Sequence, residues 1–202
     1  MSSLRMIATK AALRREVLAA RAEAHRDGAR RAKRAADLAL DVLDIPSLLE
    51  NGSRVAGYRP IRTEIDPGAL LLALHKAGVP LAMPVVIGAA RPLSFRPWHP
   101  GAAEVEGAFG APIPADETDV TPDVLIVPLV AFDAGCARLG YGGGFYDRTI
   151  ERLTEGARPL MTVGMAYAAQ QVGEVPREDT DKLLDAVVTE AGVVRRREDP
   201  AR

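Results

Sequence analysis

The feature that most constrains the fold of this chain is the apolar run "PDVLIVPLVAF" at residues 122–132. A β-strand buried on both faces reads as a continuous apolar run, whereas a strand with one solvated face alternates apolar and polar residues. Strands buried in this way occur in parallel sheets that helices cover on both sides. The run therefore predicts a central strand of an α/β protein.

The segments around this run alternate between strand-like and helix-like patterns. Helices are expected at 4–25, 30–43, 65–78 and 145–157, and further strands at 53–60, 79–86, 91–98, 158–167 and 183–190. The alternation predicts an open, mostly parallel sheet with helices on both faces. We expect residues 1–202 to form a single domain, with 190–202 as a frayed, flexible tail. The connection at 99–122 is long enough to predict a functional or mobile loop.

Cysteine usage and hydropathy bear on location. The one cysteine, Cys136, excludes an intramolecular disulfide and fits a reducing compartment, and we interpret it as a small loop residue. The first ten residues lack the apolar segment of a signal peptide. The longest apolar stretch, 68–90, is interrupted by His75, Lys76 and two prolines, so it cannot span a bilayer as a continuous helix. We therefore expect a cytoplasmic protein with no membrane partner.

The net charge of −1 conceals an uneven distribution of charge. Residues 5–34 carry ten Lys and Arg residues against three acids. A basic arm of this kind is compatible with nucleic-acid binding, but no aromatic residues lie nearby to stack on bases, which favours a solvated helix face. On the expected helix, Lys10, Arg14, Val17 and Arg21 line up at helical spacing.

A glycine-rich segment, "CARLGYGGGFYDR", follows the central strand and precedes an expected helix. It lacks the lysine and hydroxyl residue of a P-loop, and Phe145 stands where a dinucleotide fingerprint requires glycine. Two interpretations stay open: an anion-binding loop at a helix N-terminus, or a tight turn that needs left-handed glycines. Positive charge for a phosphate would come from Arg138, Lys10 and Arg14. Asp147 would either hold Mg²⁺ or stabilise the first turn of the helix.

Four segments together carry a resemblance to a known family. "RLGYGGGFYDR" resembles the signature of the 5-formyltetrahydrofolate cyclo-ligase family, also called 5,10-methenyltetrahydrofolate synthetase. "KAALR", "YRPIRTEID" and "TDKLLDAVVTE" are similar to three further family segments in the same order. The resemblance covers nearly the whole chain, and it implies a Rossmann-related sheet of the ribose-phosphate-isomerase-like group.

The resemblance also implies an activity. Enzymes of this family use ATP and Mg²⁺ to cyclise 5-formyltetrahydrofolate to 5,10-methenyltetrahydrofolate, with release of ADP and phosphate through a phosphorylated formyl group, an imidate phosphate. Such chemistry needs positioning and charge stabilisation, so no residue is expected as a covalent nucleophile. The expected partners are 5-formyltetrahydrofolate and ATP, with no nucleic acid, and the protein is expected to be a monomer.

The resemblance assigns roles to particular residues. Arg59 and Glu64 correspond to folate-binding positions, and Asp147 and Asp181 to magnesium ligands. The ATP-binding positions are Lys10, Arg14, Arg138, Leu139, Gly140, Tyr141, Gly142, Gly143, Gly144, Phe145 and Tyr146.

The sequence departs from the family pattern at three positions. Gly143 stands where some relatives have lysine, so Lys10, Arg14 and Arg138 would carry more of the phosphate contact. Phe145 replaces a common tyrosine, and Thr180 precedes Asp181 where histidine or asparagine is frequent. The single tryptophan, Trp98, is interpreted as a partly buried packing residue in preference to a stacking face for folate.

Two other functions fit parts of the pattern. A sugar-phosphate isomerase or transferase on a similar sheet would also need a phosphate loop. A non-enzymatic nucleotide-binding or nucleic-acid-binding module would use the basic helix. Neither accounts for Glu64, the glycine loop and Asp181 together.

Overall fold

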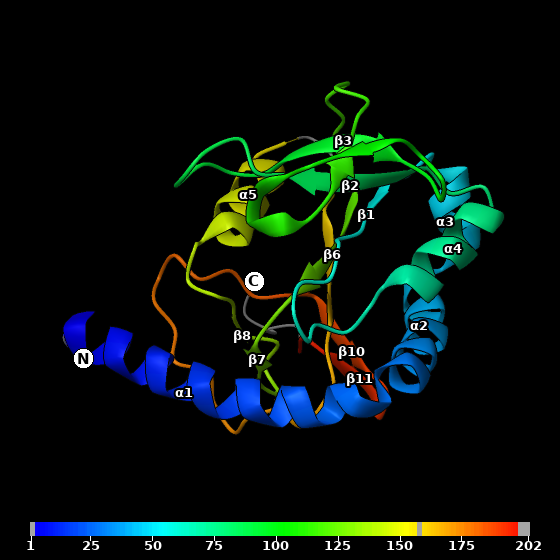
Figure 1. Cartoon of the computed structure of the whole chain (residues 1–202). Coiled ribbons are helices and arrows are strands. Elements are labelled where there is room, and N and C mark those ends of the chain that lie inside the picture. The colour runs from blue at the N-terminus through cyan, green and yellow to red at the C-terminus, as the bar shows by residue number, and fades with distance from the viewer. Residues whose placement is uncertain (1–2, 157–158, 198–202) are drawn as a thin grey trace.

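A seven-stranded sheet forms the centre of the computed structural model, which describes residues 3–156 and 159–197 (Figure 1). Its strand order is β11-β10-β9-β6-β1-β2-β3. The strands are β1 (Val55–Ala56), β2 (Leu81–Val85), β3 (Ser94–Trp98), β6 (Val124–Pro128), β9 (Met161–Met165), β10 (Ala186–Thr189) and β11 (Gly192–Arg195). The five inner strands pair in parallel, and β3 and β11 pair antiparallel at the two edges. The predicted α/β class with a mostly parallel sheet is confirmed.

The helices and small elements complete the described fold. The helices are α1 (Ser3–Ala24), α2 (Gly28–Leu43), α3 (Ile45–Glu50), α4 (Gly68–Lys76) and α5 (Phe145–Thr154), with short 3₁₀ turns η1 (His25–Asp27), η2 (Ala108–Gly110) and η3 (Ala168–Gln170). Two small ribbons pair β4 (Glu104–Val105) with β5 (Ile113–Pro114) and β7 (Ala131–Phe132) with β8 (Arg138–Leu139). The long connection at 99–122 thus contains the first ribbon. None of the helices in the described ranges is both long and apolar enough to cross a bilayer.

The central strand β6 is buried on both faces. Val124 and Ile126 point into one apolar cluster that includes residues of α2 and α4, whereas Leu125 and Val127 point into a second cluster that includes Ile150 of α5. Successive side chains of a strand alternate between faces, so helix cover on both faces requires an uninterrupted apolar sequence. The sequence run at 122–132 is therefore explained by α2 and α4 on one side and α5 on the other.

Helix α1 packs on segments that follow the carboxyl ends of the sheet strands, and in Figure 1 it runs along the lower margin of the molecule. Val17 of α1 belongs to a third apolar cluster with Val130 and Leu139, which follow β6. The helix also contacts η3, which follows β9. Its buried positions include Lys10 and Arg21 as well as apolar residues, so the face it turns to the protein is partly charged.

Two predicted chain features differ in detail from the structure. Residues 190–202 were expected to be a frayed tail, but Gly192–Arg195 form β11 and extend the sheet, with Val187 opposite Val194. Residues 198–202 lie outside the described part of the chain. The helix expected at 65–78 is shorter, Gly68–Lys76, and ahead of it the Asp66 carboxylate accepts a hydrogen bond from the Gly68 N–H at 2.8 Å.

Gly164, in the middle of β9, gives a test of core packing. A Cβ at this position would lie 2.7 Å from Leu184 Cδ1 and 2.8 Å from Leu129 Cδ2. We expect Gly164→Ala to lower the free energy of unfolding by about 1–3 kcal/mol, because an overpacked core must shift its neighbours. Urea denaturation measures the change. Gly173→Ala, where nothing lies within 4 Å, is the matched control with a change below about 0.5 kcal/mol; equal stability of the two variants would contradict the packing argument.

Candidate active site

The site lies where the strand order of the sheet reverses. From β1 the chain continues to β2 and β3 on one side, and from β6 it continues to β9 and β10 on the other, while β1 and β6 are neighbours. Loops that leave the carboxyl ends of two such strands diverge and form a crevice, which is where open α/β sheets bind ligands. Glu64 follows β1, and the glycine loop follows β6 through the β7–β8 ribbon. The topology thus brings two of the predicted site segments to one place.

Lys10 of α1 is tied to the segment before β10. Its Nζ donates to Asp181 at 2.6 Å and to Glu178 at 3.0 Å, and the residue is buried. Burial acts to lower the pKa of Lys10, but the hydrogen bonds and charges of Asp181 and Glu178 outweigh it and leave the pKa above its ordinary value. Lys10 is therefore a charged ammonium that holds Asp181 close to α1. No role was predicted for Glu178 from the sequence.

Arg14, one turn further along α1, holds the glycine loop. Its Nε donates to the Gly140 carbonyl at 2.8 Å. A Cβ at Gly142 would lie 3.4 Å from Arg14 Nη2, so the guanidinium lies directly against the loop backbone. The predicted pairing of a cationic α1 face with the glycine loop is thus present as a direct contact.

The loop uses its glycines for different reasons. Gly142 and Gly144 have φ values of +101° and +64°, in the left-handed region that favours glycine. A Cβ at Gly143 would meet the Phe145 ring at 2.8 Å. Between residues 140 and 144, no backbone N–H donates to another described residue. The loop therefore combines a turn that requires left-handed glycines with a row of available N–H groups at the start of α5.

The flanking residues of the loop differ in what they expose. Leu139 is buried beside Val17, and its carbonyl accepts a hydrogen bond from the Val130 N–H at 2.7 Å. Phe145 begins α5, and the guanidinium of Arg148 lies 5.5 Å from its ring. Tyr141 is 39% exposed at the tip of the loop.

Arg138 draws together the two carboxylates that were predicted to bind metal. Its Nη2 donates to Asp147 Oδ1 at 2.7 Å, and its Nη1 donates to the Lys182 carbonyl. The Lys182 N–H in turn donates to Asp147 Oδ1 at 3.0 Å. Burial lowers the pKa of Arg138, while the negative charges of Asp147 and Asp181 act in the opposite direction. Asp147 thus anchors the residue that follows Asp181, and both carboxylates lie near one guanidinium.

The donor set fits a nucleotide-bound Mg²⁺ better than a metal held by protein alone. Within residues 3–156 and 159–197, no group of three or more His, Cys, Asp or Glu side chains is placed to hold a metal ion. Mg²⁺ is commonly held by one or two carboxylates together with substrate phosphates. In the described ranges, hydrogen bonds engage Oδ1 of Asp147 and Oδ2 of Asp181, which leaves one oxygen of each carboxylate for another ligand.

Glu64 is a buried carboxyl group, only 4% exposed. Its Oε2 accepts a hydrogen bond from the Ile61 N–H at 2.9 Å. Burial raises its pKa to about 7, although the Ile61 hydrogen bond and the positive charge of Arg21 act to lower it. Burial and the charge of Glu64 also raise the pKa of the Tyr146 phenol, so Glu64 lies near the start of α5 as well as α1.

Arg21 is the site residue that the sequence did not assign. The residue is fully buried, and it donates from Nε to Thr63 Oγ1 at 3.1 Å and from Nη2 to the Tyr141 hydroxyl at 2.5 Å. The only signal in the sequence was its alignment with Lys10 and Arg14 on one helix face. That signal did not distinguish it from the other cations of residues 5–34.

Arg59 is not brought to this group by any contact among the described residues. It forms an ion pair with Glu104, and its guanidinium lies 4.9 Å from the centre of the Trp98 ring. The Trp98 indole N–H donates to the same carboxylate at 3.0 Å, and Trp98 is packed in the apolar core. The packing role expected for Trp98 agrees with this environment.

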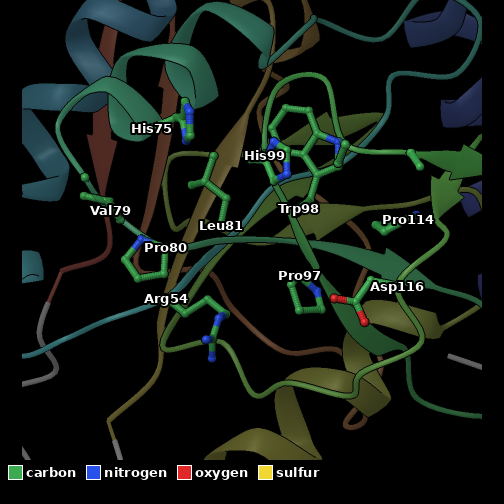
Figure 2. A pocket seen from close by; sticks show the side chains of 13 residues that line it. Arg54, His75, Val79, Pro80, Leu81, Pro97, Trp98, His99, Pro114 and Asp116 are labelled. Carbon is green, nitrogen blue, oxygen red and sulfur yellow. The ribbon is translucent and has the colours of Figure 1, made fainter.

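A pocket of about 480 Å³ lies elsewhere in the molecule (Figure 2). Arg54 and Pro80, which precede β1 and β2, line it together with Trp98 at the end of the antiparallel β3. These positions lie at the amino edge of the parallel strands, opposite the glycine loop. None of the predicted site residues lines this pocket.

Cys136 has no feature of a nucleophile. It is buried with φ at +60°, and burial raises the pKa of its thiol to about 11. The interpretation of Cys136 as a small loop residue agrees with this environment.

Fold and site together define an α/β protein with a cationic helix, a glycine loop and paired carboxylates at a topological switch point. The model of the 5-formyltetrahydrofolate cyclo-ligase family matches residues 6–190. The 5-formyltetrahydrofolate cyclo-ligase of Escherichia coli K12 is 39% identical over 145 residues, which is 69% of this chain and 79% of the relative. The corresponding protein of Mycolicibacterium smegmatis is 32% identical over 148 residues, 69% of this chain and 74% of that one.

A solved structure is similar over almost the full length. The NMR structure of 5,10-methenyltetrahydrofolate synthetase from Aquifex aeolicus matches with a TM-score of 0.77 and 32% identity, and the match covers 96% of this chain and 95% of that one. This chain belongs to the 5-formyltetrahydrofolate cyclo-ligase family, and the resemblance found in the sequence is confirmed.

The raised pKa of Glu64 predicts a pH dependence of stability. Between its ordinary value of 4.5 and about 7, the folded protein keeps a proton on Glu64 that the unfolded chain releases. The free energy of unfolding should therefore fall as the pH rises through this window, by at most about 3 kcal/mol from this group. Glu64→Gln keeps an acceptor for the Ile61 N–H but does not titrate, so it should lose this part of the slope. Urea denaturation of both proteins at pH 4.5 and 7.5 measures it; identical slopes would contradict the buried-acid assignment.

Proposed function

We propose that this chain cyclises 5-formyltetrahydrofolate to 5,10-methenyltetrahydrofolate, with ATP converted to ADP and phosphate, at the crevice between the β1 and β6 loops. The observation that carries the proposal is the meeting of Lys10, Arg14, the glycine loop and the carboxylates of Asp147 and Asp181 in one place. Membership of the cyclo-ligase family supplies the reaction class.

ATP is needed because a formamide carbonyl is a poor electrophile and oxide is not a viable leaving group. The formyl oxygen attacks the γ-phosphorus, the bond to the β,γ-bridging oxygen breaks, and ADP leaves. The neighbouring secondary amine of the folate then attacks the carbon of the resulting imidate phosphate. The carbon–oxygen bond breaks, phosphate departs with the former formyl oxygen, and the amine proton leaves with it. The ring closes as a methenyl bridge, and all atoms balance.

The nucleotide site consists of cations and backbone N–H groups. Lys10, Arg14 and Arg138 would bring positive charge to the phosphates, and the backbone of Gly140–Tyr146 would wrap them. The unpaired N–H groups at the start of α5 add donors that favour an anion. A phosphoryl transfer requires positioning and charge stabilisation of this kind, and it does not require a covalent nucleophile.

Asp147 and Asp181 would hold Mg²⁺ together with the phosphates. When bound, Mg²⁺ offsets the charge of the nucleotide and makes the γ-phosphorus a better electrophile. The support for this assignment is the second oxygen that each carboxylate keeps available and the nearby Arg138, which holds Asp147 in position.

Glu64 would bind the folate. A buried carboxyl group next to the crevice is a suitable acceptor for the N–H donors of a pterin ring. Arg59 would take part only if its guanidinium left Glu104, its present partner. The expected monomeric state and cytoplasmic location stay predictions.

The proposal predicts a direct spectroscopic result. Purified protein with 5-formyltetrahydrofolate, ATP and Mg²⁺ should produce the near-ultraviolet absorption band of methenyltetrahydrofolate, and omission of either ATP or Mg²⁺ should abolish it. A flat trace from folded protein that still binds ATP would keep the nucleotide site and reject the folate. A sugar-phosphate enzyme or a nucleotide-binding module would then be the better interpretation.

The metal assignment predicts the behaviour of Asp147→Asn and Asp181→Asn. Each variant should lower turnover by about 100-fold or more at limiting Mg²⁺, since a metal contributes several kcal/mol of charge stabilisation. Asp147→Asn also weakens the pairing of Arg138, so Asp181→Asn is the cleaner variant. The matched control is Glu151→Gln, an exposed acid of α5 that pairs with Lys182. If both Asp variants show normal turnover at limiting Mg²⁺, the metal role is rejected.

A further inference from the structure

The environment of Arg21 combines full burial with a hydrogen-bond donor that has no partner among the described residues. Its guanidinium is fully buried, and burial of a charge is costly unless its donors are used. Nε and Nη2 are used by Thr63 and Tyr141, whereas Nη1 is buried with no hydrogen-bond partner in the part of the chain that the structure describes. Buried donors without a partner are rare in native proteins, so the unused Nη1 indicates a role for this group.

The two acceptors of Arg21 belong to two different loops. Thr63 stands next to Glu64 in the loop after β1, and Tyr141 stands in the glycine loop after β6. The Tyr141 ring also lies 5.5 Å from the Arg21 guanidinium and 5.8 Å from that of Arg62. One planar guanidinium on a rigid helix therefore sets the position of both loops at once.

We propose that Arg21 is a positioning residue that couples the two substrates, so that binding of nucleotide at the glycine loop strengthens binding of 5-formyltetrahydrofolate at the Glu64 loop, and the reverse. The inference rests on the proposed function, because it takes one loop as the nucleotide site and the other as the folate site. Such a link would serve the chemistry, since the formyl oxygen must be held against the γ-phosphorus. Nη1 is then the donor left for an acceptor that a bound substrate brings.

The coupling is measurable without turnover. Isothermal titration calorimetry would give the Kd of 5-formyltetrahydrofolate alone and in the presence of Mg²⁺ with a non-hydrolysable ATP analogue. For the wild-type protein we expect the analogue to lower this Kd by about fivefold or more, with the same factor in the reciprocal titration. The coupling ratio is the Kd of 5-formyltetrahydrofolate alone divided by its Kd in the presence of the analogue. Arg21→Lys keeps the charge but loses the planar fork, so the coupling ratio of this variant should fall to about 1.

Matched variants separate coupling from a general loss of structure. Arg15→Lys, an exposed position on the same helix, should keep the wild-type ratio. Thr63→Val and Tyr141→Phe each remove one acceptor of Arg21 and leave the guanidinium in place, and each should reduce the ratio. If circular dichroism shows that Arg21→Lys does not fold, the ratios of these two variants decide the question.

The outcomes distinguish this inference from the proposed function. A wild-type ratio of 1, or a wild-type ratio retained by Arg21→Lys or by both acceptor variants, overturns the coupling, even if the wild-type protein forms methenyltetrahydrofolate. A ratio that behaves as expected in a protein without turnover supports the coupling and rejects the proposed reaction. If the wild-type protein does not bind 5-formyltetrahydrofolate, both the coupling and the proposed reaction are rejected.

Discussion

The docking of a cationic helix onto the carboxyl end of the sheet is the interaction on which the site depends. Three cations of α1 hold three segments: Lys10 holds the segment at 178–181, Arg14 the glycine loop, and Arg21 both that loop and Thr63. Arg21 lies eleven positions after Lys10, so the helix rises about 16.5 Å between them. Buried charges need partners, so α1 has a stable position only where all of these contacts form together.

The apolar contacts of α1 alone would define its position poorly. Val17 and Ala24 are its buried apolar residues in the described range, Leu13 and Leu18 pack against the cluster of Val17 while partly exposed, and the buried Lys10 and Arg21 share this inner face. The ion pairs and hydrogen bonds therefore fix the register of the helix on the loops. The same contacts order three loops that have little regular structure of their own. Placement of the helix and the arrangement of the site loops therefore depend on the same contacts.

Much of the fold was predictable because it depends on local pattern. The run at 122–132 and the alternation of helices and strands predict the sheet and its cover, and Gly142 and Gly144 mark a loop that needs left-handed residues. The strand β11 was missed because its two valines are followed by three arginines, which resemble a solvated tail, whereas in the structure the strand pairs with β10 and packs Val193 and Val194 partly against the core.

The contacts that build the site were less predictable. Arg21 meets Tyr141 across 120 positions of sequence, and Lys10 meets Asp181 across 171. Spacing on one helix shows that cations share a face, but not which acceptors the fold brings to that face. The partner of Arg59 was missed for the same reason, since Glu104 lies in a loop whose path the sequence does not define.

The neighbouring position of β1 and β6 explains why the proposed folate and nucleotide segments meet. Their strands pair in parallel, with Val55 opposite Val124, so their following loops leave the same edge of the sheet side by side. The chain then turns away in opposite directions from the two strands, which opens the space between the loops. Many α/β proteins with other functions have such a crevice, so the crevice alone assigns no reaction. What distinguishes this one is a buried acid on one loop, a glycine-rich backbone with available N–H groups on the other, and a single guanidinium that bonds to both.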